Sequence, residues 1–67
     1  MQHQYWRAIV TLKDDTHEWD VIIWSMYQDK KAATRGAEAF TKHTAPAHGY
    51  NVVRWRVEPT PSKQEVI

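Results

Sequence analysis

The stretch that decides the fold is YNVVRWRVE, residues 50–58. Its side chains alternate between two faces of an extended chain, which is the pattern of a β-strand with one buried side. The series that we expect to face a core is Val53, Trp55 and Val57. The series that we expect to face away from it is Val52, Arg54, Arg56 and Glu58.

Two further stretches have the character of strands, and polar residues 13–18 (KDDTHE) between them predict a hairpin loop. In residues 5–12 the expected outward series is Tyr5, Arg7, Ile9 and Thr11. Residues 19–26 are β-branched and aromatic. Because Asp20 should face water, we place it outward with Ile22 and Trp24, and place Trp19, Val21 and Ile23 inward.

Residues 30 to about 43 change to a helical period, with Asp29 as the expected N-cap. The inward stripe is Ala33, Ala37 and Phe40, and the outward stripe is Lys31, Arg35, Glu38 and Lys42. An alanine stripe lets a helix lie close to a sheet. We therefore expect the gap to be filled from the strands, by Trp6, Trp55 and Trp19, and we expect Gly36 to leave room for an indole. The helix should end before Pro46.

These elements predict an α+β fold with ββαβ topology and a three-stranded antiparallel sheet in the order 2-1-3. The domain should span residues 1–61, and residues 62–67 should form a flexible tail after Pro59 and Pro61. One helix can cover only one face of the sheet. The other face mixes arginines with apolar side chains, which is typical of a docking surface. The candidate partner-binding residues are Arg54, Arg56, Arg7, Trp24, Ile22 and Tyr5.

Length and composition narrow the function classes. A chain of 67 residues is one small domain, too small to enclose a deep substrate pocket. It has no cysteine for a thiolate zinc site, no apolar run that could span a membrane, and only Gly36 and Gly49 where a phosphate-binding loop would need more glycines. Its four histidines fit no metal-binding spacing. We therefore expect neither an enzyme nor a bound metal or cofactor.

Three stretches resemble a known family. They are Tyr5-Trp6, then PAHGYNVVRWR at residues 46–56, and PTPSK at residues 59–63. In this order, around a hairpin and a helix, they resemble the small early protein of T7-like podophages that inhibits host bacterial RNA polymerase. The resemblance covers about residues 5–63 and rests mainly on the final strand.

The resemblance implies a phage protein that acts in the cytoplasm of the infected bacterial host cell and blocks transcription initiation. The residues in the place of the family's two strand arginines are Arg54 and Arg56, which would contact the jaw of the polymerase β′ subunit. The chain would act as a monomer, without a cofactor. It departs from the family in its helix, which is net basic here and strongly acidic there.

Other interpretations remain open at this level. Arg54 and Arg56 could solubilise an edge strand, and the apolar residues could form a homodimer face. The scaffold also suits another phage counter-defence inhibitor, such as an anti-CRISPR protein. A small nucleic-acid-binding module could stack bases on Tyr5 and Trp24 and hold phosphates with arginines. A net charge of only +1 argues against that last class.

Overall fold

The fold is a three-stranded sheet with one helical segment on one side, as seen in the computed structural model, which describes residues 4–61. Its elements are β1 (Trp6–Lys13), β2 (Glu18–Tyr27), α1 (Lys30–Ala39), η1 (Phe40–Thr44), α2 (Ala45–His48) and β3 (Asn51–Pro59). The strand order is β2-β1-β3, and β1 is antiparallel to both neighbours. The predicted α+β class and ββαβ topology are confirmed. The predicted 62–67 tail lies outside the described residues.

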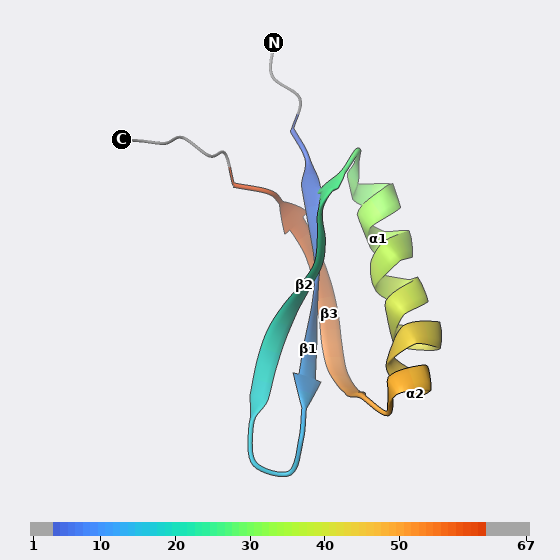
Figure 1. Ribbon diagram of the computed structural model, residues 1–67. Coiled ribbons are helices and arrows are strands. Elements are labelled where there is room, and N and C mark those ends of the chain that lie inside the picture. The colour runs from blue at the N-terminus through green and yellow to red at the C-terminus, as the bar shows by residue number, and fades with distance from the viewer. Residues whose placement is uncertain (1–3, 62–67) are drawn as a thin grey trace.

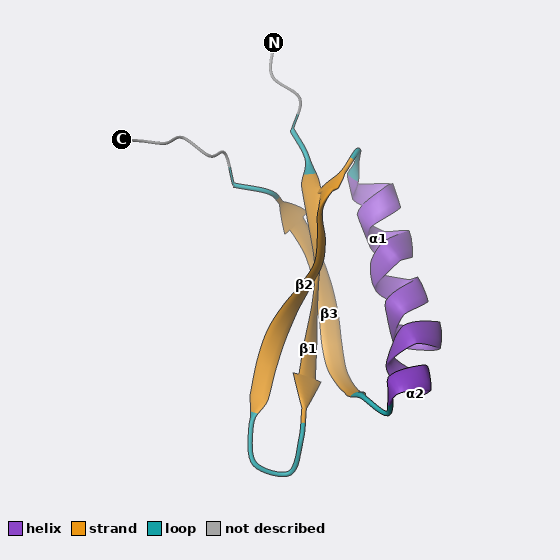
Figure 2. Ribbon diagram, in the orientation of Figure 1, coloured by secondary structure: helices purple, strands orange, loops and turns teal. Residues whose placement is uncertain are grey.

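The core lies between the central strand and the helix (Figures 1 and 2). Ala8 and Val10 of β1 are fully buried, as are Ala33 and Ala37 of α1. Val10 lies opposite Val21 of β2 and Trp55 of β3, which places Trp55 on the helix side as predicted. Burying a valine side chain contributes about 1.5–3 kcal/mol. The small helix residues leave the strands to supply most of the core volume.

Gly36 faces a strand side chain, and this neighbour differs from the predicted indole. A Cβ atom at Gly36 would lie only 2.0 Å from the hydroxyl oxygen of Tyr27. The phenol of Tyr27 therefore uses the space. Trp19 does not fill the core either, because it is 41% exposed at the far end of β2. At that end β2 diverges from the helical segment (Figure 1).

The helical segment runs past Pro46, so the prediction that it ends before this proline is wrong. A proline in a regular α-helix clashes with the carbonyl four residues earlier and lacks a donor. Here a π-helical turn, Phe40–Thr44, precedes it, and the N–H of Ala45 donates to the Phe40 carbonyl oxygen. This wider turn carries Pro46 into the short helix α2. Gly49 ends the segment in a left-handed conformation, with φ of 75°.

The predicted facing of two β3 residues, Val52 and Val53, is wrong. Val52 was expected outward, but it pairs with Leu12, which belongs to the buried series of β1. A register shift between Thr11 and Leu12 adds one residue to β3, so the simple alternation of faces fails there. Val53 was expected inward and is instead exposed. Beyond the shift, Arg54 to Glu58 keep the predicted facing.

Candidate functional site

The candidate site is the sheet face that no helix covers. Its centre is formed by Ile9 and Thr11 of β1, which point outward as predicted yet are each only 2% exposed. Ile9 lies opposite Ile22 and Arg56, and Thr11 lies opposite Asp20 and Arg54. Side chains of the two flanking strands therefore cover the central strand. The outer face therefore consists mainly of long polar and apolar side chains from β2 and β3.

A chain of polar contacts crosses all three strands on this face. The Thr11 hydroxyl donates to Asp20 Oδ1 at 2.6 Å, and Arg56 Nη2 donates to Asp20 Oδ2 at 3.3 Å. Arg56 Nε also donates to Glu58 Oε1 at 3.3 Å. Arg7 Nε donates to Glu58 Oε2 at 2.9 Å, and Arg7 Nη2 contacts the same oxygen. Arg56 and Arg7 are therefore held by acidic side chains of the chain itself.

This chain of contacts shifts the pKa values of its members in the directions that favour their charged forms. The pKa of Glu58 is lowered, first by the hydrogen bond from Arg7 and then by Arg56. The pKa of Asp20 is lowered, first by the Thr11 hydroxyl and then by Arg56. The pKa of Arg56 is raised, mainly by its hydrogen bond to Glu58. These contacts therefore favour the ionised forms of Asp20, Arg56 and Glu58.

Arg54 is the more accessible of the two β3 arginines. Its side chain is 63% exposed, against 49% for Arg56. Its ion pair with Glu18 is long, at 3.9 Å. Residues two apart in a strand rise together by roughly 7 Å, so a single acidic patch on a partner can reach both guanidinium groups.

Apolar side chains adjoin these arginines along β2. Exposure alternates from Asp20 to Tyr27, and the exposed series after Asp20 consists of Ile22, Trp24 and Met26. Ile22 lies opposite Ile9 of the outer face, whereas a register shift places Trp24 opposite Ala8. Each of the three has about half of its surface in water. Ile22 and Trp24 were predicted, and extending the same alternation by two residues would have found Met26. A surface that places three large apolar side chains in water is suited to a partner.

The structure places the other predicted residues less uniformly. Arg7 lies on the outer face but opposite Glu58, which takes up its guanidinium. Tyr5 is half-buried just before β1, and its carbonyl oxygen accepts the Thr60 N–H at 2.8 Å. Arg54 lies opposite Thr11, near the other end of β1. Tyr5 and Arg54 are therefore far apart on the sheet.

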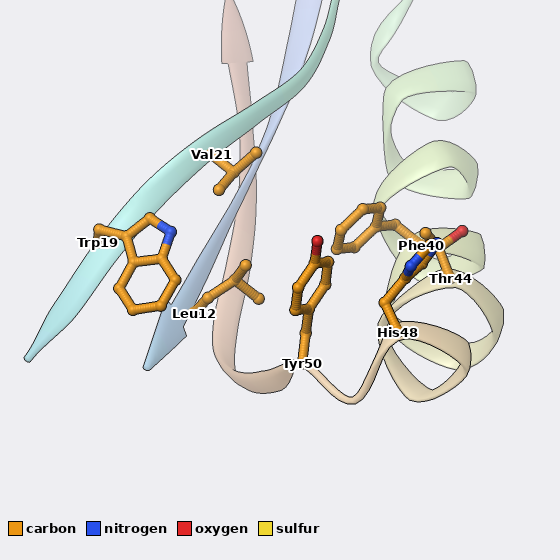
Figure 3. Close-up of a pocket in the computed structure, with 7 residues that line it drawn as sticks. All are labelled: Leu12, Trp19, Val21, Phe40, Thr44, His48 and Tyr50. Carbon is orange, nitrogen blue, oxygen red and sulfur yellow. The ribbon is translucent and has the colours of Figure 1, made fainter. Parts of the chain in front are cut away.

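A cleft on the helix side was not predicted. It has a volume of about 330 Å³ and opens where β2 diverges from the helical segment. Figure 3 shows Trp19 and Val21 on one side and Tyr50, Phe40 and His48 on the other, with the remaining lining from Leu12 and Thr44. The rings of His48 and Tyr50 stack, and their centroids lie 5.5 Å apart. Sequence periodicity gave no sign of the cleft, because it arises from the divergence of two elements.

Within residues 4–61, no group of three or more histidine, aspartate or glutamate side chains is placed to hold a metal ion. No helix in this part of the chain has both the length and the apolar character needed to cross a membrane. Comparison with protein-family models, with curated proteins and with solved structures finds no match.

Proposed function

We propose that the protein binds a surface of a multisubunit bacterial enzyme and inhibits it stoichiometrically, without turnover. The favoured target is the host RNA polymerase, at the jaw region of its β′ subunit, and the consequence is a block of transcription initiation. The chain would act as a phage-encoded monomer in the infected bacterial cytoplasm.

One observation carries the proposal: the exposed guanidinium of Arg54 lies on the uncovered sheet face with Ile22, and the half-exposed side chains of Trp24 and Met26 follow Ile22 along β2. Protein interfaces are enriched in tryptophan, methionine and arginine, and their strongest contacts come from buried aromatic and arginine anchors. A guanidinium can also bind a carboxylate through two parallel hydrogen bonds. The face therefore suits a partner patch that offers acidic groups beside an apolar pocket.

The two arginines have different parts in this proposal. Arg54 can meet a partner carboxylate first, because its one ion pair within residues 4–61 is the long contact with Glu18. Arg56 is held by Asp20 and Glu58, so its guanidinium is already ordered before binding. Ordering a side chain in advance lowers the entropy cost of association. A partner carboxylate would bind Arg56 beside Asp20 and Glu58, or would replace one of these two as its ion-pair partner.

The choice of RNA polymerase among possible partners rests on the resemblance of residues 46–56 and of the element order to the podophage inhibitor family. The ββαβ order, which the structure has, is compatible with that resemblance. A nuclease complex of a bacterial defence system is the alternative target.

The proposal is tested by measuring association with purified bacterial RNA polymerase holoenzyme by biolayer interferometry. Wild-type protein should bind, and the Arg54→Glu/Arg56→Glu variant should lose binding, since attraction becomes repulsion. The matched control is Lys31→Glu/Arg35→Glu, which changes the net charge equally on the helix. The control should keep its affinity. Equal losses in both variants, or no binding by wild type, would contradict the proposal, and recovery of nuclease subunits from bacterial lysate would favour the alternative.

A further inference from the structure

The helical segment is the most positively charged part of the chain. Residues 30–48 contain four cations, Lys30, Lys31, Arg35 and Lys42, against the single acid Glu38, which is a formal charge of +3. The whole chain carries only +1. The small net charge therefore conceals a separation of charge between the helix and the remainder of the chain.

The acids that could neutralise the helix are engaged elsewhere. Glu18, Asp20 and Glu58 pair with arginines of the sheet. Asp29 caps α1, accepting the Ala32 N–H at 2.8 Å. None of the ion pairs among residues 4–61 includes a helix cation. Lys30 has a cation–π contact with Trp6, because its ammonium nitrogen lies 6.0 Å from the centroid of the Trp6 ring.

Three of the cations form a line on the outer side of the helix, which we call the basic stripe: Lys31, Arg35 and Lys42. All three are exposed, and so is Glu38, which interrupts the stripe. In α1, spacings of three and four residues keep Lys31, Arg35 and Glu38 on one side of the helix, and Lys42 follows in the π-helical turn η1. Lys42 follows Lys31 by eleven positions, which corresponds to about 16 Å along the helical segment. The helical segment lies along one side of the sheet (Figure 1), whereas Arg54 lies opposite Thr11 on the uncovered sheet face.

The kind of partner follows from what the stripe lacks. All of the large exposed apolar residues in the described part of the chain lie outside the helical segment, on β2, on β3 or at Tyr50. A protein partner would need apolar anchors, as the sheet face offers. A nucleic-acid backbone needs only cations, because its phosphates release condensed counterions on binding.

We propose that the basic stripe binds the sugar-phosphate backbone of duplex DNA without sequence preference. It uses residues distinct from those of the sheet face, so one molecule can engage a protein through the sheet and DNA through the helix. Three phosphate contacts give weak binding on their own, with Kd on the order of 10⁻⁴ M at physiological salt. When the sheet face is already bound beside DNA, a high effective concentration makes the same contacts sufficient.

The test is fluorescence anisotropy of a fluorescein-labelled 20-base-pair duplex of arbitrary sequence, titrated with the free protein. Three phosphate contacts predict that a plot of the logarithm of the binding constant against the logarithm of the NaCl concentration has a slope of about −2.7. The affinity should therefore fall about 40-fold between 50 and 200 mM NaCl. Lys31→Glu/Arg35→Glu/Lys42→Glu should abolish binding. Glu38→Lys, which completes the stripe, should tighten binding several-fold and steepen the slope by about 0.9.

The control is Arg54→Glu/Arg56→Glu, which should keep most of its DNA affinity because those residues lie on the other side. Its failure to bind DNA, with the stripe variants unaffected, would assign DNA binding to the sheet and overturn the inference. Absence of binding by wild-type protein at 20 mM NaCl, or no gain from Glu38→Lys, would also overturn it. So would polyglutamate binding as tightly as the duplex. None of these results depends on polymerase binding, so the two proposals can fail separately.

Discussion

Replacing Gly36 by alanine tests how closely the helix approaches the sheet. In an unobstructed helix the change would stabilise the fold by about 1 kcal/mol, because glycine is a poor helix former. Here the new methyl group would lie 2.0 Å from the Tyr27 hydroxyl oxygen and 2.5 Å from the ring carbon that bears it. Forcing atoms into a packed contact costs roughly 1–3 kcal/mol. We therefore expect a net destabilisation of up to about 2 kcal/mol.

The assay is urea unfolding, followed by helical circular dichroism and tryptophan fluorescence. The informative control is the same change in a Tyr27→Leu background, which removes the atoms that approach Gly36. In that background Gly36→Ala should become stabilising by about 1 kcal/mol. If Gly36→Ala stabilises the protein equally in both backgrounds, Tyr27 does not pack under the helix and our account of the contact is wrong.

Three further expectations concern stability. Trp55→Ala should cost about 3 kcal/mol, at the lower end for large aromatic truncations because the indole is only partly buried; a thermal midpoint within a few degrees of wild type would reverse our assignment of the β3 faces. Asp29→Ala should cost about 1 kcal/mol of helix stability through loss of the N-cap, and an unchanged urea midpoint would show that the cap contributes nothing. Since the pKa values of Asp20 and Glu58 are lowered in the folded state, their stabilisation should be complete above about pH 5 and be lost as the pH falls through their folded pKa values; Glu58→Gln should reduce this acid sensitivity, and an unchanged pH profile of the unfolding midpoint would contradict the ion-pair assignment.

The element order and the strand order follow from the sequence because each rests on local periodicity and short connections. Alternation in residues 50–58 identified β3 and the inward position of Trp55, and Asp29 marked the helix start. These predictions are confirmed because burial of the apolar face of each element forms the core. The confirmed fold is thus the part that hydrophobic pattern alone can specify.

The predictions that are wrong concern strand register and departures from regular helix geometry. One additional residue in β3 turned Val52 toward the buried side, and no composition signal marks such an insertion. The usual rule about proline assumes a regular α-helix, whereas a π-helical turn carried the segment past Pro46. The pairing of Arg56 with Asp20 and Glu58 follows from the cross-strand register, which cannot be read from the sequence.

The central claim is that the outer sheet face inhibits a bacterial RNA polymerase through Arg54 and Arg56. The most direct measurement is run-off transcription by purified holoenzyme from a promoter template, with the protein at a several-fold molar excess. We predict that wild-type protein blocks initiation stoichiometrically and that Lys31→Glu/Arg35→Glu retains inhibition in this excess. Arg54→Glu/Arg56→Glu should be inactive while still folded, as shown by its helical circular dichroism at the assay temperature, with a lower melting temperature because the Arg56 ion pairs are lost. Undiminished transcription in the presence of wild-type protein would contradict the claim.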